Sequence, residues 1–216
     1  MSAAAELEQG WVDRDLALEL PELALFSLVV DAAPGRSSRG MRERLRLLSD
    51  RFHGARAVAL RREPVPAAYR AFFRQVGMDP DAERTPVEAA AIKRLMEGGF
   101  APTNSVDDAL LLAVVETGVP VWALDDERLD GPIGLRPARP GERMGEGEYA
   151  HDAPPGRIVV ADARAPVALL FGLIAQSHVP SKRTRRMRLF SVQVAGVPPI
   201  HVEEALWLCA EALEDG

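Results

Sequence analysis

The sequence predicts an α+β (mixed α/β) fold, with a single domain whose mixed, largely antiparallel sheet is packed by helices. Three observations support this prediction. Apolar helices with clear capping signals alternate with short buried strands, an order that by itself allows α/β as well as α+β. The 216 residues are 47% hydrophobic, ample for a real core. The chain also contains no internal repeat and no low-complexity segment.

The first 65 residues are expected to form an N-terminal strand–helix elaboration, and residues 66–216 the core of the domain. Arginines line the polar side of the helix expected in this first part, whose apolar positions recur at helical spacing. The elements expected here are an amphipathic helix or irregular arm at 5–20, a strand at 22–31, a helix capped by Ser37 or Ser38, and a short strand at 57–60.

The core is expected to begin with two helices that have clear start and end signals. Pro66 suits a helix start, and aromatic residues follow it at helical spacing. For the second helix, Thr85 and Glu88 form a capping box, and Gly98 marks the end. We expect both helices to act as scaffold.

The stretch NSVDDALLLAVVETGVPVWALD, residues 104–125, organises the rest of the chain. Ser105 is the expected N-cap of a buried helix, with Asp108 as its capping-box partner. Gly118 provides the stop, and a short buried strand follows at residues 121–124. Later elements are strands at 133–137, 157–162, 167–175 and 187–194, a surface hairpin or loop at 139–156, a polar loop at 176–184 and a last helix at 201–213.

Charge and cysteine content restrict the function. The net charge of −6 argues against a general nucleic-acid coat protein. Basic residues nevertheless cluster at 36–62 and 182–188, where they form either a solvated face or a contact surface for phosphates. Cys209 is the single cysteine, which excludes an internal disulfide and a cysteine zinc cluster, and it is expected to be an inert core thiol. We expect a cytoplasmic protein without a membrane segment, metal or cofactor, and without affinity for DNA.

The residues Asn104, Val106, Asp107, Pro120, Ala123 and Asp125 carry a family resemblance. Their pattern resembles the core of the B3/B4 domain of the bacterial phenylalanyl-tRNA synthetase β-subunit. There, an asparagine-x-valine-aspartate helix start is followed by a long apolar helix and a proline-x-histidine-alanine-x-aspartate strand. The resemblance covers about residues 69–215 and is closer to free-standing relatives of that domain. It implies tRNA and an amino-acid-like small molecule as partners.

The resemblance also implies a ligand pocket that would edit mischarged tRNA. Trp122 replaces the family's histidine, and the family's glutamate falls at about Phe190 or Ser191. Indole cannot act as a base, so Trp122 either stacks on a ring or fills the core. Gly172 either backs the pocket or forms a bulge. His178, in the polar loop, is either a proton donor at the pocket or part of a solvated loop.

Three hypotheses follow: a trans-acting factor that hydrolyses mischarged aminoacyl-tRNA, a non-catalytic module that binds tRNA or an amino-acid-like ligand, and a globular protein without a relevant ligand. In the first two, Trp122 and Gly172 face each other across one cavity with Asn104 near its rim. The catalytic residues are unassigned. The expected substrate-binding residues are Asn104, Pro120, Trp122, Ala123, Gly172, Gln176 and His178, and the expected nucleic-acid-binding residues are Lys182, Arg183, Arg185 and Arg186.

Overall fold

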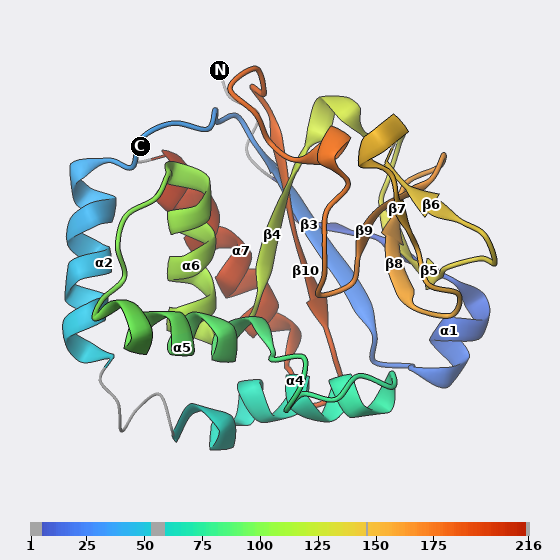
Figure 1. Cartoon of the computed structure of the whole chain (residues 1–216), viewed down its shortest axis with the longest axis horizontal. Helices are drawn as coiled ribbons and strands as arrows, with labels where there is room; N and C mark the ends of the chain where they lie inside the picture. The colour runs from blue at the N-terminus through green and yellow to red at the C-terminus, as the bar shows by residue number, and fades with distance from the viewer. Residues whose placement is uncertain (1–5, 53–58, 146, 215–216) are drawn as a thin grey trace. The chain divides into compact units, whose positions relative to one another are not determined.

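The computed structural model describes residues 6–52, 59–145 and 147–214, and these form the expected α+β fold. The chain divides into two compact units (Figure 1). Unit 1 comprises Met1–Ala33 and Ala123–Gln193, and unit 2 comprises Pro34–Trp122 and Val194–Gly216. One domain with an elaboration over residues 1–65 stays a prediction, and each unit is described by itself below.

Unit 1 is built on two four-stranded sheets. In the first, β3 and β10 are antiparallel neighbours over their whole length, and most residues of both strands are buried. Arg188 on β10 donates to the hydroxyl of Ser27 on β3, 3.1 Å away. The strand order of this sheet is β1 (Glu8–Gln9), β3 (Ala24–Val30), β10 (Met187–Gln193) and β4 (Val121–Asp125).

The second sheet of unit 1 contains a close contact between Trp11 and Gly134. A Cβ on Gly134 would lie 2.1 Å from the Trp11 ring, so only glycine fits this position. The indole N–H of Trp11 donates to the carbonyl of Pro132 at 3.1 Å. The strand order is β2 (Trp11–Val12), β5 (Gly134–Pro137), β8 (Ile158–Ala161) and β9 (Pro166–Leu169), in which β2 is parallel to β5 and the other pairs are antiparallel.

Unit 1 also contains a short helix and a short hairpin. The helix α1 (Arg14–Glu19) follows β2. The acidic Gly/Pro-rich passage at 139–156 contains a short hairpin of β6 (Arg143–Met144) and β7 (His151–Asp152), as the sequence suggested.

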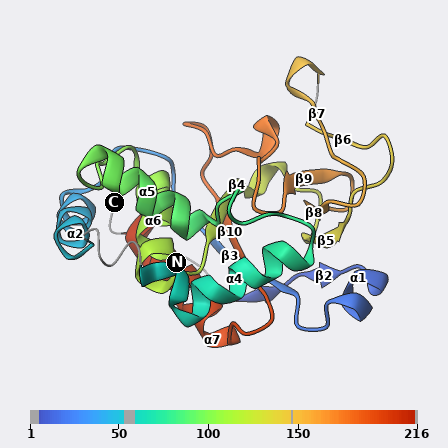
Figure 2. The same cartoon turned by 60° about the horizontal axis from the view of Figure 1, so that its bottom comes forward.

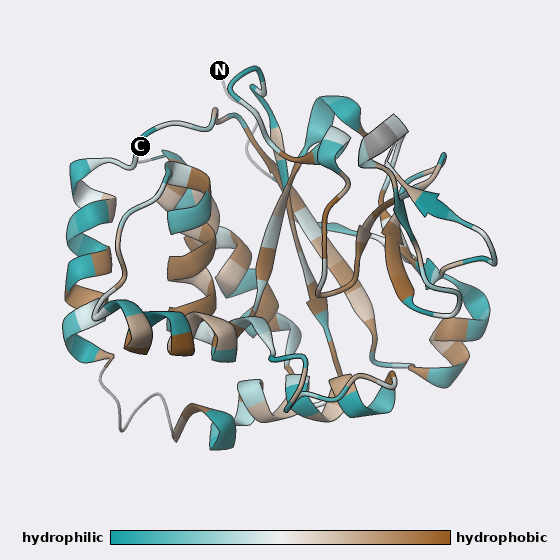
Figure 3. Ribbon diagram, in the orientation of Figure 1, coloured by the Kyte–Doolittle hydropathy of each residue, from teal (hydrophilic) through white to brown (hydrophobic). Residues whose placement is uncertain are grey.

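Unit 2 is a group of helices around α6, which packs against α2, α5 and α7 (Figures 1 and 2). Ala109, Leu112 and Ala113 on α6 have no solvent exposure, and the ribbon of α6 is among the most apolar in Figure 3. The helices are α2 (Arg39–Arg51), α4 (Pro64–Gln75), α5 (Pro86–Glu97), α6 (Ser105–Thr117) and α7 (Pro199–Glu214).

Most predicted caps are present. Ser38 caps α2, accepting a hydrogen bond from the backbone N–H of Met41. Thr85 and Glu88 form the capping box of α5. Gly118 ends α6 with a left-handed φ of 78°, a conformation that favours glycine.

The prediction that Ser105 caps α6 is wrong, because Asn104 is the N-cap. The side-chain oxygen of Asn104 accepts from the N–H groups of Val106 and Asp107, at 3.1 and 3.0 Å. The Ser105 hydroxyl instead accepts from the N–H of Gly35 at 3.0 Å. Asp108 accepts from the N–H of Thr103, so it is not a capping-box partner.

Three predicted boundaries also change. The arm at 5–20 contains β1, β2 and α1. Residues 57–58 of the strand expected at 57–60 lie outside the described residues, and Leu60 begins the 3₁₀ turn η1 (Leu60–Arg62). The strand expected at 167–175 ends at Leu169, because Phe171 adopts a left-handed φ of 58° and the chain turns.

Candidate functional site

Two polar cavities adjoin the 3₁₀ turn η4 (Gln176–His178) in unit 1. Their volumes are about 590 and 300 Å³, and Arg128 and Ser177 line both. The larger cavity is also lined by Leu129, Asp130, Gly145, Asp162, Arg164, Ala165, Pro166 and His178. The smaller is also lined by Asp125, Glu127, Gln176, Val179, Ser181 and Arg183.

His178 makes two hydrogen bonds through its ring. Its Nε2 lies 3.1 Å from the carbonyl oxygen of Arg128, and its Nδ1 lies 3.0 Å from the hydroxyl of Ser177. Burial lowers the pKa of His178 below its ordinary value of 6.5, although the charge of nearby Asp162 opposes this shift. A carbonyl oxygen can only accept, so we assign the proton of the neutral ring to Nε2. The lone pair of Nδ1 is then available to the Ser177 hydroxyl.

Asp162 is a buried carboxylate beside His178 in the larger cavity. Burial opposes its ionisation, but backbone N–H groups outweigh burial and lower its pKa. These groups belong to Asp130 at 2.9 Å, Ala165 at 2.8 Å and Arg164 at 2.9 Å. Asp162 is therefore a fixed negative charge in this wall of the cavity.

The end of β4 is tied to the polar loop by one buried hydrogen bond. The hydroxyl of Thr184 donates to the carboxylate of Asp125 at 2.6 Å, and both residues are buried. The other carboxylate oxygen of Asp125 accepts from the N–H of Glu127 at the start of η2 (Asp126–Arg128). Asp125, one of the family-pattern residues, thus fixes the backbone on which Arg128 is carried.

The basic loop divides into two groups. Arg186 and Arg188 both bind Asp126, and the bond to Asp126 raises the pKa of Arg186. The exposed side chain of Arg185 donates to the backbone carbonyls of Lys182 and Thr184. Lys182 and Arg183 are exposed, and the structure gives no ion pair for either among the described residues.

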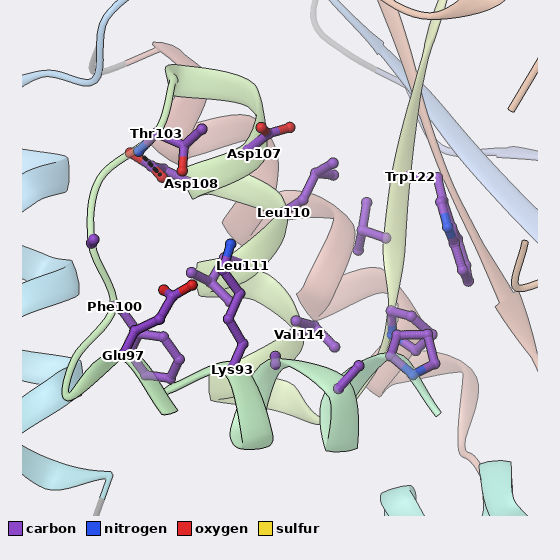
Figure 4. Close-up of a pocket in the computed structure, with 16 residues that line it drawn as sticks. Lys93, Glu97, Phe100, Thr103, Asp107, Asp108, Leu110, Leu111, Val114 and Trp122 are labelled. Carbon is purple, nitrogen blue, oxygen red and sulfur yellow. Dashed lines mark hydrogen bonds between the residues drawn. The ribbon is translucent and has the colours of Figure 1, made fainter. Parts of the chain in front are cut away.

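A third cavity, of about 370 Å³, lies in unit 2 beside α5 and α6 (Figure 4). Pro120 and Trp122, both predicted site residues, are among the residues that line it. In the view of Figure 4, β4 passes between the Trp122 ring and the side chains of Leu110 and Val114. The indole itself is half-buried.

The predicted substrate-binding residues fall into separate places. Gln176 and His178 adjoin the polar cavities of unit 1, and Ala123 is buried in β4. Asn104 is occupied in capping α6, next to lining residues of the third cavity. Gly172 is exposed in the turn after β9, where a Cβ would lie 2.9 Å from that of Leu169. A shared cavity of Trp122 and Gly172 stays a prediction, since the two residues belong to different units.

Comparison with known proteins decides the family. A family model described as B3/4 domain matches residues 68–204. The chain belongs to the B3/4 domain family. The match includes the Asn104–Asp125 stretch and the whole polar loop with His178. It therefore includes residues of both compact units.

The curated relatives are phenylalanine–tRNA ligase beta subunits. The one from Xanthomonas axonopodis pv. citri is 41% identical over 68 residues, and the one from Xanthomonas campestris pv. campestris (strain 8004) is 35% identical over 97 residues. These segments cover 32% and 43% of this chain, but only 8% and 12% of the relatives. The chain thus matches only a small part of each relative's length.

Several residues have roles that sequence reasoning missed. Arg128 and Asp162 come together with His178 only through the fold, although Asp162 directly follows a buried strand, a common place for site residues. Ser177 directly precedes His178 in the chain, so its position was readable, but its contact with the ring was not. Cys209, in contrast, is fully buried as expected, and burial raises the pKa of its thiol, which makes it a poor nucleophile. Among the described residues, no His, Cys, Asp and Glu side chains form a cluster suited to a metal, and no helix could span a membrane.

Proposed function

We propose that this B3/4 domain hydrolyses the ester bond of a mischarged aminoacyl-tRNA, with Ser177 as nucleophile and His178 as base. The observation that carries the proposal is the 3.0 Å contact between Ser177 Oγ and His178 Nδ1 inside a polar cavity. The family relation supplies the substrate class, since the relatives are subunits of a tRNA ligase.

The three groups match the requirements of nucleophilic catalysis. The nucleophile and base are within hydrogen-bond distance, and a third group, the Arg128 carbonyl, orients the base. The lowered pKa keeps the His178 ring neutral at pH 7, so Nδ1 can accept a proton. Arg128 lines the same cavity and supplies a positive charge for the oxyanion that forms on the ester carbonyl.

The chemical step then proceeds in two halves. Ser177 Oγ attacks the ester carbonyl carbon while its proton passes to Nδ1 of His178. The C–O bond to the terminal ribose breaks, and the ribose oxygen takes that proton from the imidazolium. Water then attacks the acyl-serine, again losing a proton to His178, and the free amino acid leaves as Ser177 regains its proton.

The test is a deacylation screen over a panel of correctly and incorrectly charged tRNAs. We expect accelerated ester hydrolysis for at least one mischarged tRNA, lost in Ser177→Ala. Ser181→Ala is the matched control, because Ser181 lines the smaller cavity, and its hydrogen bonds within the described part of the chain go to Arg183 and Thr184 and not to His178. Equal hydrolysis by the Ser177→Ala and Ser181→Ala variants would overturn the assignment of the nucleophile.

A second candidate function is non-catalytic binding of tRNA. It is favoured by Trp122 at the position of the family's histidine and by the buried, uncharged residues Phe190 and Ser191 at that of its glutamate. Filter binding of the same tRNAs distinguishes the two candidates. Retention of tRNA without any accelerated hydrolysis would support the binding module and contradict the deacylase.

A further inference from the structure

The cavity in unit 2 has an apolar wall contributed by two helices. Leu110, Leu111 and Val114 line it from α6 (Figure 4). Ala89 and Ala90 line it from α5. Leu110 and Leu111 are only half-buried, whereas Ala109, Leu112 and Ala113 on the same helix are fully buried. The volume of about 370 Å³ lies within the range of roughly 300–1,000 Å³ typical of small-molecule sites.

The charged residues around this cavity are mostly acidic. Glu97, Asp107 and Asp108 contribute three negative charges and Lys93 one positive charge, so the lining carries a net charge of −2. Asp108 is buried and accepts hydrogen bonds from Ser37 and Thr103. The charge of Asp108 contributes to the negative potential in the cavity, but its carboxylate oxygens already accept hydrogen bonds from the protein.

Glu97 and Asp107 are the carboxylates that a ligand can reach. Both are exposed at the rim, one from each of the two helices. The structure gives Asp107 one side-chain partner, Asn104, at 2.7 Å from Oδ2, and gives Glu97 none within the described part of the chain. Lys93 extends from α5 toward α6 in Figure 4 on a flexible stem. A cation entering the cavity would therefore be attracted by two accessible carboxylates and repelled by a single ammonium group on a flexible side chain.

From this combination we propose that the cavity beside α5 and α6 binds an apolar molecule that carries a primary ammonium group. The apolar body lies on Leu110, Leu111 and Val114, and the negative charges of Glu97 and Asp107 attract the ammonium group to the rim. Charge complementarity selects this ligand class over an apolar carboxylate, which would face the net charge of −2. The proposal does not depend on ester hydrolysis by Ser177 and His178.

Three probes with the same phenyl ring and a similar chain test the charge selection: 2-phenylethylamine, 3-phenylpropanamide and 3-phenylpropionate. Isothermal titration calorimetry with the full chain measures their Kd values. We expect 2-phenylethylamine to bind most tightly and 3-phenylpropionate most weakly. Tighter binding of the propionate, which would identify Lys93 as the dominant charge, or binding of none of the three would overturn the proposal.

Substitutions locate the binding site. Glu97→Gln and Asp107→Asn should each weaken 2-phenylethylamine binding by about two- to fivefold, the range expected for exposed ion pairs. Lys93→Met should strengthen it. Glu116→Gln is the matched control, because it removes one carboxylate from α6 at a residue that pairs with Arg44 and is not part of the lining. Equal weakening by the control and by Asp107→Asn would show a nonspecific charge effect and contradict the assigned site.

Discussion

The ring of His178 lies 3.1 Å from the carbonyl oxygen of Arg128, a residue 50 positions earlier in the chain. This contact fixes which ring nitrogen carries the proton and leaves Nδ1 directed at Ser177. The positions of η2 and η4 thus determine the tautomer of a side chain that we propose to be catalytic.

The lowered pKa of His178 predicts a pH dependence of stability. Burial favours the neutral ring in the folded chain, so below pH 6.5 the unfolded chain binds more protons than the folded one. The free energy of unfolding should therefore fall as the pH drops from 6.5 through the lowered pKa, and be unaffected above it. Urea unfolding of the parent and of His178→Gln at several pH values measures this. The difference between the two proteins should change with pH in that window, and a constant difference would contradict the shift.

The division of the basic loop predicts which cations bind tRNA. Lys182→Ala with Arg183→Ala should weaken tRNA binding and reduce the slope of log K against log salt by about 0.7–0.9 for each lost phosphate contact. Arg186→Ala removes one of the two partners of Asp126 and should chiefly lower the melting temperature. Filter binding across a salt series provides the measurement. A larger loss of tRNA affinity in Arg186→Ala than in the double variant would show that the ion pair opens on binding.

The N-cap of α6 predicts unequal effects for two adjacent residues. Asn104→Ala removes the acceptor for two backbone N–H groups and should cost about 0.5–2 kcal/mol of unfolding free energy. Ser105→Ala loses a single hydrogen bond, to Gly35, which typically contributes about 0.5–1.5 kcal/mol. Helicity followed by circular dichroism during thermal melting distinguishes a cap from a tertiary contact. A larger loss of unfolding free energy in Ser105→Ala than in Asn104→Ala would support Ser105 as the N-cap, as the sequence predicted.

Leu110 and Leu112 provide a matched pair on α6. Leu112 is fully buried, so Leu112→Ala should cost about 2–5 kcal/mol through lost burial and a new cavity. Leu110 lines the existing cavity and is half-buried, so Leu110→Ala should cost clearly less. Urea denaturation of both variants gives the comparison. Equal costs would show that the cavity side of α6 is packed in solution.

Local signals predicted much of the fold. The capping box of Thr85 and Glu88 and the stop at Gly118 were readable, because each depends on a few adjacent residues. The N-cap of α6 was not, since Asn104 and Ser105 are both good caps and a tertiary contact with Gly35 occupies the second. The turn after Leu169 could not be predicted, because the sequence stays apolar through it and the left-handed φ falls on Phe171 and not on a glycine.

The candidate site was less accessible to sequence reasoning. Gln176 and His178 were identified from the polarity of their loop, and the structure places both at polar cavities. Their partners Arg128 and Asp162 are distant in sequence and carry no local motif. Only the arrangement of η2, η4 and the loop after β8 brings these groups together.

Single-turnover deacylation of a mischarged tRNA by the parent, His178→Gln and Ser181→Ala tests the proposed hydrolysis most directly. Removal of the base should slow ester hydrolysis by about 10²–10⁴-fold, while Ser181→Ala should stay close to the parent rate. A parent protein that hydrolyses the ester no faster than buffer, or a His178→Gln variant that hydrolyses it at the parent rate, would contradict the assignment of His178 as the base.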